Sequence, residues 1–365
     1  MKRILVYGMT DNPGGIESYL MFMMEKLKTY DIQMDFVTDF PTIAYKEQLE
    51  AAGAKIHFIP AKGKKLFKHM SSLKKILKSH PEYETVYFNI LDAGAVFTAI
   101  VPKFMGRQVI CHSHNGDTDK EKLHKLCKPL LTSITDKYVA CSKLAAEYMF
   151  KKKVQDRVLI IPNAINVDNY RFDTASREHT RDILNVKDKF VVCHIGRITR
   201  QKNPYRMLDI FEEIYKLDKE SVLLYVGNGD MSEEVNLEVK KRIEASNAEK
   251  KEPYIRMLGV RDDIPCILQA ADVFLLPSLY EGLPIVAVEA QAAGLPIVMS
   301  TNITKEVALT DKVKYIDLEE SDTYWANALL AIKNEPRTSG HKQVAEAGYD
   351  KNSMSAVFKE FTEWL

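Results

Sequence analysis

The chain has 365 residues, of which 46% are hydrophobic and 28% are charged, and its formal net charge is +1 at pH 7. This length exceeds one ordinary core and predicts two domains of a globular protein, and no apolar run approaches the length of a membrane span. The near-neutral balance of the whole chain disfavours nucleic-acid binding. The opening residues, MKRILVYGMT, turn polar too early for a secretion signal, so we expect a cytoplasmic protein.

Strand-like apolar runs alternate with helical patterns along the whole chain. The first series is RILVYG, MDFV, KIHFI, TVYFNI, QVICHS, KYVA and VLIIPN, and the second is KFVVCHIG, SVLLYVG, YIRML, VFLL, LPIVMS and VKYID. This alternation predicts an α/β protein with two doubly wound domains in tandem. We assign residues 1–168 to the first domain and 169–345 to the second. We expect 346–365 to form a helix that packs back on the first domain.

Basic charge is concentrated in the first half of the chain. Residues 1–170 hold 25 Lys and Arg against 18 Asp and Glu, whereas the remainder holds 26 against 32. The densest basic stretch, 62–80, places four apolar residues on one helical stripe: Leu66, Met70, Leu73 and Leu77. We favour a helix that packs this stripe on its own sheet and leaves its lysines in water. Docking on an anionic membrane is the alternative.

Each predicted domain has a glycine loop after its first strand. In the first domain Gly14 and Gly15 precede a helix, and in the second Gly196 is followed by Arg197 and Lys202. A planar guanidinium and a mobile ammonium at the carboxyl edge of a parallel sheet suit a diphosphate.

Neither glycine loop matches the fingerprint of a dinucleotide-binding or P-loop protein. The nearest approach begins at Gly227, after SVLLYV, and lacks the third glycine. An oxidoreductase and a nucleoside triphosphatase are therefore disfavoured.

Two acids, Glu281 and Glu289, lie eight positions apart in VFLLPSLYEGLPIVAVEAQAAGLPIVMS. The segment predicts a strand, a loop, a helix beginning near Pro284 and a second strand, and the helix N-terminus is suited to an anion. At about 100° per residue, Glu289 would lie roughly 80° around the helix from Glu281. In isolation such acids are usually a helix cap and a surface residue, but the surrounding pattern favours a site.

The segment CHSHNGDTD follows a predicted strand of the first domain. His112 and His114 share one side-chain direction if the strand continues. A single histidine is most often structural, but the strand end facing the ligand edge makes His114 a candidate. A zinc pair is disfavoured because no third ligand is evident.

Together GRITRQKNP, YVGNGD, the acid-pair segment, IPNAINVDNY and PGGIESYL resemble the retaining glycosyltransferases of family four, especially bacterial enzymes of exopolysaccharide or capsule synthesis. The resemblance covers almost the whole chain. It implies the GT-B fold, in which two Rossmann-like domains face a central cleft. The first domain would bind the acceptor and the second the nucleotide-sugar donor.

The resemblance also implies roles for individual residues. Arg197 and Lys202 would hold the diphosphate, Glu281 the donor sugar and Glu289 the ribose, while His114 would lie beside the transferred sugar. His114, Glu281, Arg197 and Lys202 are the implied catalytic residues. The implied donor site further includes Gly15, Gly196, Gly227, Leu258, Gly282, Leu283, Pro284 and Ile285. Gly14, His112 and Asn115 are the implied acceptor-binding residues.

No cofactor and no metal are implied, because the departing phosphate would itself take the acceptor's proton. The expected donor is a uridine diphosphate sugar, and the acceptor a saccharide, carried on a lipid at the inner face of the cell membrane. The alternatives are a nucleotide-sugar epimerase of the same fold and a non-catalytic nucleotide-sugar binding protein. The chain departs from the family at Ala164 and Asn166 in the hinge, and at Asn115, which replaces an acid.

Overall fold

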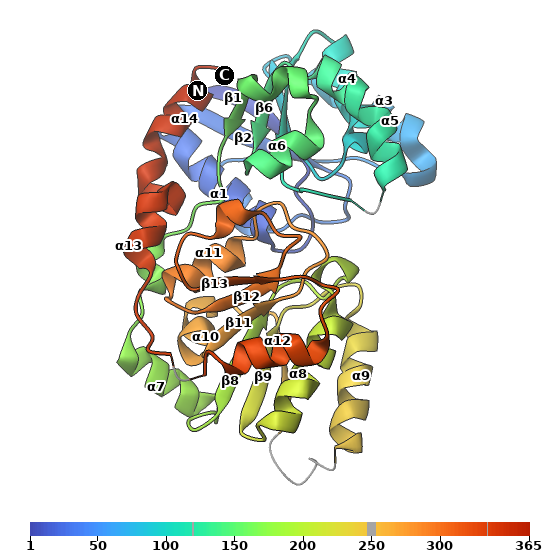
Figure 1. Cartoon of the computed structure of the whole chain (residues 1–365). Coiled ribbons are helices and arrows are strands. Elements are labelled where there is room, and N and C mark those ends of the chain that lie inside the picture. Colours follow the sequence, from blue (N-terminus) through green and yellow to red (C-terminus); the bar gives the residue numbers. More distant parts are fainter. Residues whose placement is uncertain (119, 247–252, 334) are drawn as a thin grey trace. The chain divides into compact units, whose positions relative to one another are not determined.

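The computed structural model describes residues 1–118, 120–246, 253–333 and 335–365, and it divides the chain into two compact units (Figure 1). Unit 1 comprises Met1–Asn163 and Met354–Leu365, and unit 2 comprises Ala164–Ser353. Each unit is built on one parallel sheet flanked by helices. This confirms the prediction of two Rossmann-like α/β domains.

The sheet of unit 1 has seven parallel strands in the order β3-β2-β1-β4-β5-β6-β7. The strands are β1 (Lys2–Tyr7), β2 (Ile32–Thr38), β3 (Ile56–Phe58), β4 (Thr85–Ile90), β5 (Gln108–Ser113), β6 (Lys137–Ala140) and β7 (Val158–Ile160). Every residue of β2 and β4 is buried, as expected for strands covered by helices on both faces. Continuous apolar runs therefore identified these strands correctly.

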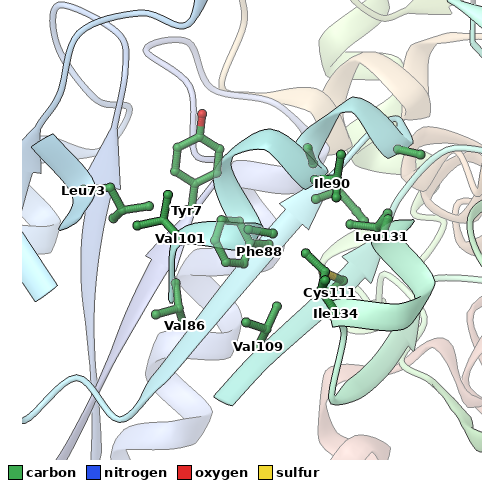
Figure 2. Packing of buried hydrophobic residues seen from close by; sticks show 14 of the residues in the cluster. Tyr7, Leu73, Val86, Phe88, Ile90, Val101, Val109, Cys111, Leu131 and Ile134 are labelled. Atoms are coloured by element: carbon green, nitrogen blue, oxygen red, sulfur yellow. The ribbon is translucent and has the colours of Figure 1, made fainter. Parts of the chain in front are cut away.

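The main core of unit 1 lies between its sheet and a layer of helices. Figure 2 shows Phe88 and Cys111 of the sheet in one cluster with Leu73 and Leu131 of these helices. The helices of the unit are α1 (Gly15–Lys28), α2 (Lys46–Ala51), α3 (Leu66–Ser79), α4 (Val96–Phe104), α5 (Glu121–Ile134), α6 (Lys143–Met149) and α14 (Ser355–Thr362).

Helix α3 packs its apolar stripe on its own domain, which is the arrangement that we favoured from the sequence. Leu73 and Leu77 are fully buried in the core, and Met70 packs against it. Its lysines remain on the exposed side. The apolar stripe of 62–80 therefore packs on the core of its own domain.

The C-terminal helix α14 belongs to unit 1, as predicted. The rings of Phe22 in α1 and Phe358 in α14 meet edge to face with centroids 5.4 Å apart, and Phe361 packs on Tyr87 in the same way. These buried aromatic contacts attach the end of the chain to the first domain.

Unit 2 has six parallel strands in the order β10-β9-β8-β11-β12-β13. The strands are β8 (Phe190–Ile195), β9 (Ser221–Val226), β10 (Ile255–Gly259), β11 (Val273–Leu276), β12 (Ile297–Ser300) and β13 (Val313–Ile316). The helices are α7 (Thr174–Ile183), α8 (Pro204–Leu217), α9 (Ser232–Ala245), α10 (Ile264–Ala270), α11 (Ile285–Ala292), α12 (Asp322–Leu330) and α13 (His341–Val344). The neighbouring strands β8 and β11 bring the two candidate loops of this unit to one edge.

The chain enters unit 2 between Asn163 and Ala164 and leaves it between Ser353 and Met354, whereas the sequence-based division used 168 and 345. Ile165 and Asp350 form an isolated parallel bridge, which attaches both connecting segments to unit 2. Within the described ranges, no helix is both long and apolar enough to span a bilayer.

Candidate functional site

Two loops of unit 2 meet at the carboxyl edge of its sheet. One follows β8 and contains the short 3-10 helix η5 (Arg200–Lys202), and the other follows β11. Gln201 joins them: its side-chain Nε2 donates to the Tyr280 carbonyl over 3.0 Å, and its backbone carbonyl accepts from Leu279 N over 2.8 Å. Because these two hydrogen bonds hold the loops together, the side chains that they carry are pre-positioned.

An ion pair between Lys202 and Glu281 occupies this junction. Lys202 Nζ lies 2.5 Å from Glu281 Oε1, and the two side chains are only 13% and 8% exposed. Gln201 Nε2 donates to the other carboxylate oxygen over 3.3 Å. We call this pair the Lys202–Glu281 site. The structure thus joins two residues predicted from separate motifs, 79 positions apart.

The glycines of the β8 and β9 loops allow a close backbone approach at this edge. Gly227 has φ +136°, and a side-chain carbon there would lie 2.0 Å from the Gly196 carbonyl oxygen. No residue other than glycine fits such a contact. Arg197 projects from the adjacent position and is exposed. Leu258 lies half-buried near the carboxyl end of the edge strand β10.

Helix α11 begins one residue after Pro284, at Ile285. Pro284 has ψ 111°, so it is the cap residue rather than part of the helix. Glu281 is therefore not on the helix but in the preceding loop, where it forms a parallel bridge with Ile303. The expected angle of roughly 80° between the two acids is wrong, because only Glu289 follows the helical period of about 100° per residue.

The loop between Glu281 and α11 is enclosed. Gly282, Leu283 and Pro284 are all buried, and Ile285 at the first helical position is half-buried. The N-terminus of a helix presents N–H groups and a partial positive charge, so this end of α11 suits an anion.

Glu289 in the second turn of α11 has a partner that the sequence did not reveal. The hydroxyl of Tyr170, from the 3-10 helix η4 (Val167–Tyr170), donates to Glu289 Oε1 over 2.7 Å. Burial raises the pKa of Glu289, while the Tyr170 hydrogen bond and the charge of Lys351 act in the opposite direction. Tyr170 lies 119 positions away, at the end of IPNAINVDNY, and nothing in that motif indicated a bond to Glu289.

His194 in β8 is a second residue that sequence reasoning missed. Its Nδ1 bonds to the Leu275 carbonyl at 2.9 Å, so Nδ1 carries the proton and Nε2 can only accept. Nε2 is buried, has no partner among the described residues and lies beside Gly196. Burial lowers the pKa of His194 to about 3. The polar residue within the apolar run KFVVCHIG was the available signal.

In unit 1, two histidines lie together at the end of β5, and we call them the His112–His114 site. Their ring centroids are 4.0 Å apart, which confirms that both side chains point to the same side of the sheet. His112 Nδ1 lies 2.5 Å from the Tyr87 hydroxyl, which is 3.3 Å from that of Tyr19. Burial lowers the pKa of His112 well below its usual value, and the neighbouring His114 acts in the same direction.

The tautomer of His114 follows from its partner. Asn89 donates through Nδ2 to the Tyr7 carbonyl, so its Oδ1 accepts from His114 Nε2 over 2.9 Å. Nδ1 of His114 is therefore an acceptor, and it has no partner among the described residues. Burial lowers the pKa of His114 to about 3, so the ring is neutral near pH 7. Asn115 follows it, half-buried.

Gly14 and Gly15 stand at the start of α1, as expected. Gly14 is the extended cap residue and Gly15 the first helical residue. Glu17 in the first turn reaches back to Thr10, whose N–H and hydroxyl donate to Oε1 over 3.1 and 2.8 Å. These bonds reach Thr10 rather than the cap residue Gly14, so Glu17 does not form a capping box. The carboxylate fixes the loop in which the two glycines lie.

Across the described residues, no group of three or more His, Cys, Asp or Glu side chains is arranged to hold a metal ion. All five cysteines are free thiols.

Comparison with family models assigns both parts of the chain. Residues 13–169 match the model described as "Glycosyltransferase Family 4", and residues 176–350 match "Glycosyl transferases group 1".

Individual proteins give the same picture. The chain is 27% identical to the putative glycosyltransferase EpsF of Bacillus subtilis, over 96% of this chain and 93% of that protein. It is 29% identical to the UDP-Gal:alpha-D-GlcNAc-diphosphoundecaprenol alpha-1,3-galactosyltransferase of Escherichia coli, over 73% and 70%. Anabaena Alr3699/HepE, solved in complex with UDP and glucose, shares the fold with a TM-score of 0.80 at 18% identity, covering all of both chains.

Proposed function

We propose that this chain, which belongs to the family 4 glycosyltransferases with a group 1 second domain, transfers a hexose from a uridine diphosphate sugar. The acceptor is a saccharide carried on a lipid, and the reaction serves the synthesis of a cell-surface polysaccharide. The configuration of the sugar is retained, and no metal is required.

The Lys202–Glu281 site is the observation that carries this proposal. A nearly buried cation and carboxylate, 2.5 Å apart at the carboxyl edge of a parallel sheet, offer charge to a diphosphate and acceptor oxygens to sugar hydroxyls. Arg197 adds a second cation from the same β8 loop that carries Lys202. A diphosphate that binds Lys202 would share this ammonium with Glu281, which keeps the carboxylate directed at the adjoining sugar.

Glu289 would bind the ribose. Tyr170 occupies one carboxylate oxygen, Oε1, so Oε2 remains to accept from ribose hydroxyls. Because Glu289 lies on α11, the ribose would sit beside the helix whose N-terminus approaches the phosphates.

In the proposed reaction the bond between the anomeric carbon and the diphosphate oxygen breaks. A new bond forms from the acceptor hydroxyl oxygen to the same carbon, and the hydroxyl proton passes to the departing phosphate. Lys202, Arg197 and the α11 N-terminus stabilise the charge that grows on the phosphate. The neutral His114 accepts a hydrogen bond from the transferred sugar through Nδ1. Positioning and electrostatics thus replace a protein general base.

The acceptor assignment is supported by the relatives. The Escherichia coli galactosyltransferase acts, by its name, on a sugar attached to diphosphoundecaprenol, and EpsF spans almost the same length as this chain. The UDP and glucose in Anabaena HepE likewise support a uridine diphosphate hexose as donor. The enzyme would therefore work at the cytoplasmic face of the membrane.

Mixing the full-length protein with UDP-glucose or UDP-galactose and a lipid-linked monosaccharide tests the proposal. We expect acceptor-dependent release of UDP, unchanged by EDTA, and a product whose anomeric configuration, read by NMR coupling constants, matches that of the donor. Release of free sugar without acceptor would instead indicate an epimerase of this fold. Donor binding without turnover would indicate a non-catalytic binding protein.

A thermal-shift screen with uridine, guanosine and adenosine diphosphates and their sugars provides the donor control. Ligand well above its dissociation constant should stabilise the protein by a few kcal/mol. If no nucleotide raises the melting temperature, the donor site is wrongly assigned.

A further inference from the structure

Three helices of unit 1 lie side by side on one face of its sheet. Helix α4 packs between α3 and α5, and Figure 1 shows the three as neighbours. Their inner sides supply core residues such as Leu73, Ala99 and Leu131. Their outer sides expose large apolar residues, which are Phe67 of α3, Phe97 and Phe104 of α4, and Leu123, Leu126 and Leu130 of α5.

The exposed apolar residues of α4 and α5 form ordered stripes. On α5 they fall at 123, 126 and 130, and on α4 at 97 and 104 with the half-buried Ile100 between them. This spacing places each set along one side of its helix. Phe104 is 85% exposed and Leu126 is 77% exposed. Large apolar residues exposed on neighbouring helices are typical of an interaction site.

Positive charge accompanies these stripes. The sequences of α3, α4 and α5 contain eight lysines and one acid, Glu121, which pairs with Lys125. The lysines are Lys68, Lys74, Lys75, Lys78, Lys103, Lys122, Lys125 and Lys128. Lys103 pairs with Asp136, which lies between α5 and β6. A second copy of this face would bring like charges together, whereas an anionic surface would be attracted.

We propose that this surface, the α3–α5 face defined by the six exposed apolar residues and eight lysines above, docks on an anionic lipid bilayer. The phenylalanines and leucines enter the boundary between headgroups and acyl chains, and the lysines contact lipid phosphates. The face differs from the apolar stripe of 62–80, since Leu73 and Leu77 are buried in the core. The proposal extends the proposed function, whose acceptor is lipid-linked, but docking itself requires no nucleotide.

Flotation of the full-length protein with vesicles tests the docking. We use phosphatidylcholine vesicles with and without phosphatidylglycerol. Wild type should bind the anionic vesicles and not the neutral ones, and added salt should weaken the binding. Leu126→Ser should lower the partition coefficient about tenfold, because a large apolar side chain no longer enters the bilayer. Lys122→Gln should lower it about fivefold.

Matched controls lie on α9 of unit 2, where Leu237 and Lys241 are also exposed. Leu237→Ser and Lys241→Gln should leave vesicle binding unchanged. Equal losses in the control and test variants would overturn the assignment of the face. Equal binding to neutral and anionic vesicles, or to none, would overturn the docking itself.

A soluble polyanion separates a lipid surface from a general anion site. If heparin binds wild type and Leu126→Ser equally, and Leu126→Ser also keeps full vesicle binding, the face is a polyanion site and the proposal fails. UDP affinity, measured in the same variants, should remain that of wild type. A loss of vesicle binding with intact UDP binding would thus test this proposal separately from the donor assignment.

Discussion

The carboxyl edge of one sheet carries a charged site, and the carboxyl edge of the other carries a neutral one. In unit 2 the edge holds a charged pair, Lys202 and Glu281, at 2.5 Å. In unit 1 the corresponding edge holds two imidazoles, His112 and His114, whose pKa values burial lowers so that both are neutral. One architecture thus holds both a charged site and a neutral site, because buried charges persist only where they are paired.

This difference agrees with the proposed division of labour. A diphosphate requires cations, and in the proposal Lys202 and Arg197 supply them. A transferred sugar is uncharged at its hydroxyls, so a neutral acceptor such as Nδ1 of His114 is sufficient. Substitutions at the charged edge of unit 2 and at the neutral edge of unit 1 test this contrast.

The largest effect is expected from Lys202→Ala, which removes the buried cation. Transfer should fall about 10²- to 10³-fold, as for the loss of a key electrostatic group. The unpaired Glu281 should also destabilise the fold by about 3 kcal/mol. Steady-state kinetics and denaturant unfolding measure both effects.

Arg197→Ala separates catalysis from stability, since Arg197 is exposed and outside the ion pair. It should depress transfer while leaving unfolding unchanged. Lys241→Ala on α9 serves as the surface control. Transfer within twofold of wild type in Lys202→Ala would remove the Lys202–Glu281 site from the mechanism.

His114→Ala breaks the neutral site. We expect kcat to fall about 10²-fold, because an acceptor directed at the reacting sugar is lost. The pH profile of kcat in wild type should show no inflection between pH 5 and 8, because His114 titrates at about 3. An inflection near 6.5 that disappears in His114→Ala would contradict a neutral imidazole.

Acid should destabilise unit 1 more than unit 2. Unfolded imidazoles bind a proton below about pH 6.5, whereas His114 in unit 1 and His194 in unit 2 do so at about 3. The unfolded chain therefore binds more protons, and stability falls as pH drops below 6.5. Each such histidine contributes about 1.4 kcal/mol per pH unit between 5.5 and 4.5. Burial also lowers the pKa of four more histidines of unit 1, which are His57, His69, His112 and His124.

Tryptophan fluorescence can follow the two units separately. Trp364 belongs to unit 1 and Trp325 to unit 2, so single-tryptophan variants report each transition. The midpoint for unit 1 should shift more between pH 5.5 and 4.5. A larger shift for unit 2 would show that burial does not keep the unit 1 imidazoles neutral.

The smallest expected effect is that of Tyr170→Phe, which removes one hydrogen bond to Glu289. The affinity for UDP should fall about fivefold, the equivalent of a hydrogen bond of about 1 kcal/mol. If the bond orients the carboxylate toward ribose, 2′-deoxy-UDP should lose less affinity than UDP. Equal losses for both ligands would restrict Tyr170 to a structural role.

The strands were predictable because parallel strands buried on both faces need continuous apolar runs, and VFLL became β11 as expected. The charged loops were predictable because glycine and basic residues followed such strands. The Tyr170–Glu289 hydrogen bond was not predictable. Its partners lie 119 positions apart, and no local sequence pattern around either residue indicates the other.

Other features required the packing itself. His194 looked like an interruption in an apolar run, and only its bond to the Leu275 carbonyl explains it. The helical angle assigned to Glu281 was wrong because the helix begins after Pro284, so the period did not apply to the loop. Helices α4 and α5 have apolar residues on two sides. The sequence does not say which side is buried, and only the packed core shows that the other side is exposed.

The dissociation constant of UDP, measured by titration calorimetry in wild type, Glu289→Gln and His114→Ala, tests the division between the two edges most directly. The account predicts about tenfold weaker binding in Glu289→Gln, because a hydrogen bond to a charged group is lost, and binding within twofold of wild type in His114→Ala. Weaker binding in His114→Ala with unchanged binding in Glu289→Gln would contradict it.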